Sequence, residues 1–124
     1  MKLREVVFDC DDPASLARFW AEVLDGFEVR AYDEEEVARL DALGFTPETD
    51  PNVMVDGPGL NFGFQKTDTG SPRKNKVHLD VESSDRSGDV DRLTSLGASI
   101  VETYASSTWL RDPEGNDFCV TDST

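Results

Sequence analysis

The sequence of 124 residues is short of several residue types, and each shortage excludes a class of protein. Its two cysteines, Cys10 and Cys119, are too few for a disulfide scaffold and favour a reducing compartment. Its single histidine, His78, excludes a multi-histidine metal site. The sequence has no CxxC pair, no glycine-rich phosphate loop and no G-x-S-x-G elbow, so zinc ribbons, thioredoxin-type sites and nucleotide-binding loops are not supported.

Positive charge and long apolar runs are also scarce. Lys and Arg number 12 against 26 Asp and Glu, which gives a formal net charge of −14. This excess argues against nucleic acid and anionic membranes as partners. No apolar run approaches the roughly 20 residues that span a bilayer, and the first residues lack a signal-peptide core. We therefore expect a cytoplasmic protein whose acidic surface either serves solubility alone or attracts a cationic ligand.

What the sequence does contain is an ordered series of secondary structure elements. Apolar alternation predicts a strand over 2–10, and Asp12-Pro13 begins a helix with Phe19 on its inward face. A helix is also predicted over 85–96, and Leu96 is among the apolar side chains expected to face inward from it. The remaining predicted elements are a strand over 27–32, an acidic helix over 33–43, a hairpin over 52–66, a polar linker over 67–76 and strands over 76–82, 98–103, 107–111 and 116–121.

The order strand, helix, three strands thus occurs twice. Weak self-similarity supports the repeat, because residues 5–9 align with residues 78–82. The acidic helix makes the first copy longer. The length fits one domain, residues 1–124. We expect an α+β fold in which two βαβββ modules, about 1–68 and about 75–124, form a curved mixed sheet.

Four stretches of sequence carry a family resemblance. They are Asp11-Asp12-Pro13 with Arg18-Phe19-Trp20 and Val23-Leu24, then Asn75 to Val81, Leu93 to Ala98, and Trp109 to Cys119. The last is the most specific, because a strand leads through an Asp-Pro-Glu-Gly-Asn turn into another strand. On these stretches the sequence resembles the glyoxalase-like (vicinal oxygen chelate) superfamily, of the glyoxalase/bleomycin resistance/dioxygenase type. Residues 33–59 do not match a general pattern of that superfamily.

The resemblance implies a β-sheet cup with candidate metal ligands on the first and last strands of each module. The matching positions are Glu5, Gln65, His78 and Cys119, with Gln65 placed by internal comparison only. A divalent ion (Zn, Ni, Mn or Fe) is one expectation, and a cup without metal is the other. Cys119 departs from the family pattern, which usually has a carboxylate there. A thiolate favours zinc and removes the usual group for proton transfer.

Further candidate ligand-binding residues follow from strand parity and from the resemblance. Asp9 and Asp80 fall on the parity that faces the cup, and Trp109 could stack on a flat ligand or hold a cation. Each of these residues also has a structural alternative. For Asp9 and Asp80 it is a surface carboxylate at the end of a strand, and for Trp109 it is a core tryptophan. For His78 the structural alternative is a hydrogen-bonded lining or core histidine.

Three functions remain open from the sequence. The first is a metal-assisted lyase, isomerase or dioxygenase that binds a small molecule in the cup, with Glu5 and His78 as catalytic residues. The second is a metal-free ligand-binding or drug-sequestering protein of the bleomycin-resistance kind. The third is a regulatory or assembly module without a small ligand. The resemblance also implies a homodimer.

Overall fold

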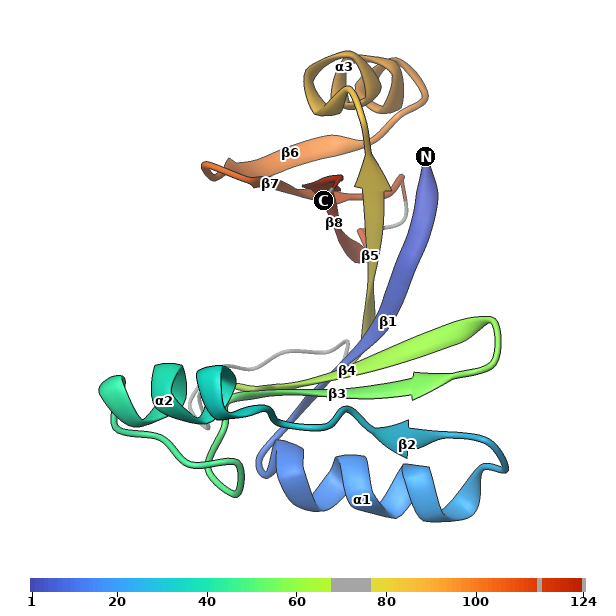
Figure 1. The fold of residues 1–124 in the computed structure, drawn as a ribbon. Coiled ribbons are helices and arrows are strands. Elements are labelled where there is room, and N and C mark those ends of the chain that lie inside the picture. Colours follow the sequence, from blue (N-terminus) through green and yellow to red (C-terminus); the bar gives the residue numbers. More distant parts are fainter. Residues whose placement is uncertain (68–76, 114, 124) are drawn as a thin grey trace. The chain divides into compact units, whose positions relative to one another are not determined.

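The computed structural model describes residues 1–67, 77–113 and 115–123. In this part of the chain the elements follow the predicted order, which confirms the α+β class (Figure 1). They are β1 (Lys2–Cys10), α1 (Pro13–Val23), β2 (Glu28–Val29), α2 (Glu34–Ala42), β3 (Asn52–Gly57), β4 (Leu60–Lys66), β5 (Val77–Ser83), α3 (Arg86–Ser95), β6 (Ser99–Thr103), β7 (Ser107–Arg111) and β8 (Asp117–Asp122). The predicted linker lies, apart from Thr67, outside the described residues.

The chain divides into two compact units. The central unit is Val7–Lys76, and the terminal unit combines Met1–Val6 with Val77–Thr124. Strands run in the order β2-β3-β4-β1 in the central unit and β1-β5-β8-β7-β6 in the terminal unit, so β1 contributes to both. The β5–β8 pair is parallel and the β7–β8 pair is antiparallel, as a mixed sheet requires. The predicted division of the sequence into two repeated modules, about 1–68 and about 75–124, stays a prediction.

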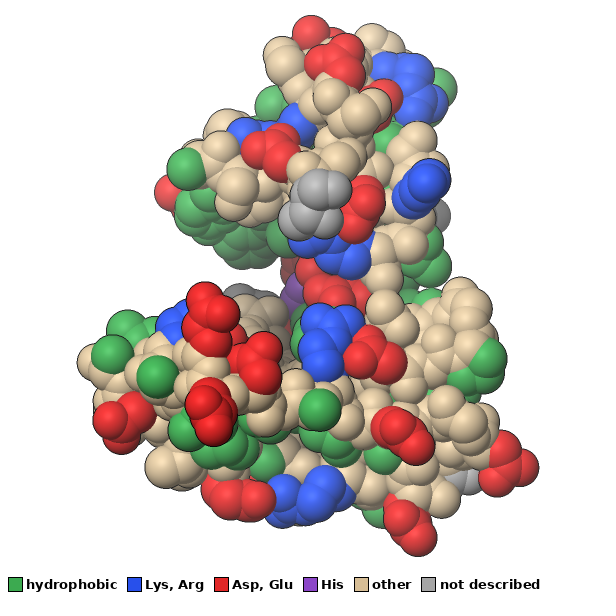
Figure 2. All heavy atoms as spheres, viewed as in Figure 1, with side chains coloured by type: hydrophobic (Ala, Val, Ile, Leu, Met, Phe, Trp, Pro, Cys, Tyr) green, Lys and Arg blue, Asp and Glu red, His purple; other side chains and the backbone are tan. Residues whose placement is uncertain are grey.

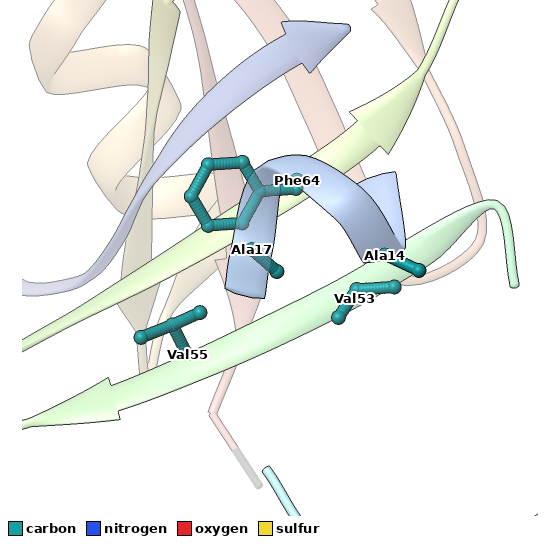
Figure 3. Packing of buried hydrophobic residues seen from close by; sticks show 5 residues of the cluster. All are labelled: Ala14, Ala17, Val53, Val55 and Phe64. Carbon is teal, nitrogen blue, oxygen red and sulfur yellow. The ribbon is translucent and has the colours of Figure 1, made fainter. Parts of the chain in front are cut away.

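The central unit is built around α1. The Asp12 carboxylate accepts a hydrogen bond from the Ser15 backbone N–H at 3.2 Å, and Pro13 occupies the first turn, so the helix begins where the sequence predicts. The helix lies on one face of the strands and buries small residues against them (Figures 1 and 3). The core is Ala14, Ala17, Val53, Val55 and Phe64.

Two apolar side chains predicted to point inward are exposed instead. Phe19 is 55% exposed and Leu96 is 67% exposed. In α1 the two alanines occupy the contact with the sheet, which leaves Phe19 at the edge of the buried face, with its ring against Trp20. Leu96 is the residue after the last turn of α3, so the helical spacing no longer determines its direction.

The terminal unit uses α3 to cover one face of its strands. Val90 from α3, Leu110 from β7 and Val120 from β8 form its core. Because successive side chains of a strand point to opposite faces, Trp109 and Cys119 point away from that core. The core of the terminal unit thereby determines which face of the sheet carries the candidate site.

The turn between β7 and β8 matches its predicted sequence signature. The backbone N–H of Gly115 donates to the Asp112 carbonyl at 2.9 Å. Gly115 has φ +85°, a conformation that favours glycine. No helix in the described residues combines the length and apolarity that crossing a bilayer requires.

Candidate functional site

A row of side chains crosses the face of the terminal unit that lies opposite its core. Asp80 on β5 is in register with Cys119 on β8, which is in register with Trp109 on β7. Neighbouring strands lie about 4.8 Å apart, so the three side chains stand next to one another on one face. Sequence parity predicted this face for Asp80, and the pairing of β5, β8 and β7 brings the three residues together.

Asp80 and Glu5 form an acid pair at the start of this row. The Asp80 side chain is 17% exposed. Burial, followed by a hydrogen bond from side chain to side chain with Glu5 and the charge of Glu5, raises the pKa of Asp80 to about 7. A hydrogen bond between two carboxyl groups requires a proton, and with a pKa of about 7 Asp80 carries that proton about half of the time at neutral pH. The Arg4 guanidinium, which pairs with Glu82 at 2.9 Å, opposes this shift only weakly.

His78 lies beside the same pair. Its Nε2 atom is 3.6 Å from Oδ1 of Asp80. That distance allows electrostatic attraction but is longer than a hydrogen bond. The terminal unit contains five of the predicted site residues, which are Glu5, His78, Asp80, Trp109 and Cys119.

Cys119 carries a proton at neutral pH. Burial, with smaller contributions from the charges of Asp80 and Asp117, raises the pKa of the Cys119 thiol to about 11. The thiolate is the form that acts as a nucleophile and binds metals. In this environment Cys119 behaves as a small, half-buried apolar residue.

A reactivity measurement checks this protonation state. At pH 8 the Cys119 thiol is expected to react with iodoacetamide about 100-fold more slowly than a thiol at the usual value of 9.0, because its pKa is about 11. A Cys10→Ser variant isolates Cys119, and the rate in denaturant supplies the reference. Equal rates in the folded and denatured protein would contradict the prediction.

Trp109 is held in place by a residue that sequence reasoning did not select. Its indole Nε1 donates to Oδ1 of Asp117 at 2.9 Å, and Arg111 Nε donates to the same oxygen at 3.1 Å. The Arg111 guanidinium also lies 5.6 Å from the centre of the indole ring. The predicted Asp-Pro-Glu-Gly-Asn turn was the available signal, since a hairpin there sets Arg111 opposite Asp117.

Three of the predicted metal ligands, Glu5, His78 and Cys119, belong to the terminal unit, and Gln65 belongs to the central unit. No group of three His, Cys, Asp or Glu side chains that could hold a metal occurs in the described ranges 1–67, 77–113 and 115–123. Glu5 is paired with Asp80 and the pKa of the Cys119 thiol is raised, so a metal bound here would have to separate that pair and release the thiol proton. The metal-ligand roles of Glu5, Gln65, His78 and Cys119 stay a prediction.

The two remaining predicted residues belong to the central unit. Asp9 is buried on β1, and Gln65 lies on β4 in register with Asn52. The Gln65 carbonyl accepts a weak hydrogen bond from the Cys10 thiol at 3.7 Å. The roles of Asp9 and Gln65 in binding stay predictions.

Comparisons with known proteins agree with the observed fold. The family model described as a glyoxalase-like domain matches residues 5–121. No curated protein matches the sequence. Among solved structures, an NAD-dependent benzaldehyde dehydrogenase from Legionella pneumophila has a TM-score of 0.65 at 13% identity, covering 96% of this chain and 97% of that one.

Two further solved structures are similar at the level of the fold. Methylmalonyl-CoA epimerase from Streptomyces coelicolor, in complex with 2-nitronate-propionyl-CoA, has a TM-score of 0.61 at 18% identity, covering 100% and 98% of the two chains. A glyoxalase/bleomycin resistance protein/dioxygenase superfamily member from Vibrio splendidus has a TM-score of 0.56 at 17% identity, covering 98% and 100%. At these identities the likeness shows the fold alone.

Proposed function

This chain belongs to the family of glyoxalase-like domains, and from that premise we propose that it is a metal-free small-molecule-binding protein. The ligand is a flat organic molecule that carries a cationic group. It binds on the face of the terminal unit that carries Glu5, Asp80 and Trp109. The acid pair is the observation that carries this proposal.

The acid pair supports a cationic ligand on electrostatic grounds. At neutral pH Asp80 is partly protonated, because its pKa is about 7. A cation placed beside the pair favours release of the shared proton and the second negative charge. The formal net charge of −14 adds long-range attraction for cations and disfavours anionic ligands.

Trp109 supports a flat ligand. Its indole N–H is fixed by Asp117, so the orientation of the ring is set before a ligand arrives. A pre-oriented ring binds a planar molecule at a lower entropic cost than a mobile one. Trp109 stands one strand beyond Cys119, and Asp80 stands on the strand at the other side. A molecule that spans the two positions meets the ring at one end and the acid pair at the other.

A calorimetric titration at pH 8 tests the proposal. The probes are proflavine, a flat aromatic cation, and acridine, its uncharged tricyclic counterpart. We expect Glu5→Gln to weaken proflavine binding roughly 10-fold, since a charge interaction is lost, and to leave acridine binding unchanged. Trp109→Ala is expected to weaken both probes by a similar factor.

The matched control is Glu22→Gln, which removes one charge from an exposed position on α1. This variant is expected to bind both probes as the native chain does. The proposal is wrong if acridine binds as tightly as proflavine, or if neither Glu5→Gln nor Trp109→Ala weakens proflavine.

Three expectations from the sequence stay predictions. A metal-assisted activity predicts that zinc, nickel or manganese raises the melting temperature of metal-free protein prepared without a histidine tag. If one of these ions does so and probe binding requires it, the metal-free assignment is overturned. The predicted homodimer is checked by sedimentation velocity, and the predicted cytoplasmic location by cell fractionation.

A further inference from the structure

A second candidate site lies wholly within the central unit. A cavity of about 470 Å³ opens between α2, the segment that follows β2, and β3. We call it the α2 cavity; the residues that matter here are Tyr32, Glu36, Arg39, Asp50, Asn52 and Met54. Its volume is in the range of small-molecule sites. Most of its lining residues lie within residues 33–59, the segment that the family resemblance left unexplained.

A buried carboxylate forms part of the cavity wall. Asp50 is 4% exposed. The Tyr32 hydroxyl donates to its Oδ2 at 2.8 Å, and the Asn52 backbone N–H donates to its Oδ1 at 2.9 Å. Both donors are neutral, and the ion pairs of the described residues do not include Asp50. A buried carboxylate costs less when positive charge lies close to it, so the cavity favours a cationic occupant beside Asp50.

The arginines of the cavity supply that charge only in part, because the charge of Asp50 raises the pKa of Arg39 less than its hydrogen bonds to Glu36 do. Arg39 forms a two-point ion pair with Glu36, at 2.6 and 3.0 Å, and Arg30 forms one with Asp56, at 2.6 and 3.0 Å. Two arginines and four carboxylates line the cavity, so its walls carry an excess of negative charge. Figure 2 shows acidic side chains over the visible surface of α2. Phosphate and carboxylate ligands are therefore disfavoured.

The remaining walls fit a short carbon chain. Tyr32 and Met54 are half-buried and offer an aromatic ring and a polarizable thioether. Burial and the hydrogen bond to Asp50 raise the pKa of the Tyr32 phenol, so it stays an uncharged donor. We propose that the α2 cavity binds a small aliphatic ammonium ion, with the ammonium group on Asp50 and the carbon chain against Tyr32 and Met54.

Amide chemical shifts of the full chain, titrated with n-butylammonium chloride at pH 7, test this site. We expect saturable shifts confined to residues 30–39 and 50–54, and none with n-butanol, which matches the shape without the charge. Shifts confined to residues 77–121 would instead report the terminal unit, so failure here is distinguishable from failure of the proposed function. Equal shifts with n-butanol would overturn the ammonium site.

Two substitutions probe the charge directly. Asp50→Asn keeps an oxygen for Tyr32 and removes the negative charge, so the dissociation constant is expected to rise roughly 10-fold. Ala31→Lys places a competing ammonium group on an exposed residue of the cavity rim without removing a contact, and is expected to weaken binding, whereas Ala31→Gln is expected to keep it. Native affinity in Ala31→Lys would reject the site even if Asp50→Asn failed to fold.

Discussion

Replacing Asp80 by Asn is expected to stabilise the protein above pH 7 and to have the opposite or no effect near pH 4. In the folded chain the pKa of Asp80 is about 7, whereas its ordinary value is 3.8. Between these values the folded state holds a proton that the unfolded state has lost. The unfolded state binds fewer protons, so the free energy of unfolding falls as pH rises through this window. Above pH 7 the loss is complete.

The size of the effect follows from the shift. A change from 3.8 to about 7 corresponds to about 4 kcal/mol between low and neutral pH, at 1.36 kcal/mol per unit. Asparagine cannot ionise, so this pH dependence disappears from the variant, whereas the other carboxylates titrate in both proteins. The difference in unfolding free energy between the variant and the native chain therefore reports on the Glu5–Asp80 pair.

Urea denaturation at pH 4.5, 6 and 8 measures this difference. Asp91→Asn serves as the matched control, because Asp91 is exposed on α3 of the same unit. Its difference from the native chain is expected to stay constant over the three pH values within about 0.5 kcal/mol. A difference for Asp80→Asn that is equally constant would show that Glu5 and Asp80 do not share a proton.

Truncating Phe64 is expected to cost about 4 kcal/mol of unfolding free energy. Its side chain is 1% exposed and packs against α1 and β3 in the core of the central unit (Figure 3). Its ring also stacks on Phe8, with the centroids 5.4 Å apart. Alanine at this position leaves a cavity between the helix and the sheet, which the surrounding residues fill only in part.

Phe19→Ala is the matched control, since Phe19 is the exposed aromatic of α1. We expect it to cost less than about 1 kcal/mol. Guanidinium denaturation followed by fluorescence, with Trp109→Phe in every chain so that Trp20 alone emits, reports on the central unit. Equal costs for the two variants would mean that the core is not where the structure places it.

Local sequence signals predicted the elements well because each depends on neighbouring residues. Asp12 and Asp33 cap the helices that follow them, through side-chain hydrogen bonds to backbone N–H groups three residues ahead. The Asp112 to Gly115 turn required the backbone freedom of glycine, and the sequence supplied it. Phe19 was misplaced because helical spacing fixes a side chain's direction on the helix, but packing decides which part of the helix is covered. Leu96 was misplaced because it follows the last turn of α3.

The order of elements, the α+β class and the strand parity that gives Asp80 and Trp109 a common face follow from local sequence patterns. Which side chains meet depends on how the strands and loops pack together. The hydrogen bonds of Glu5 with Asp80 and of Tyr32 with Asp50 each join separate segments of the chain. The register between strands and the packing of loops depend on long-range contacts, which periodicity along the sequence does not encode.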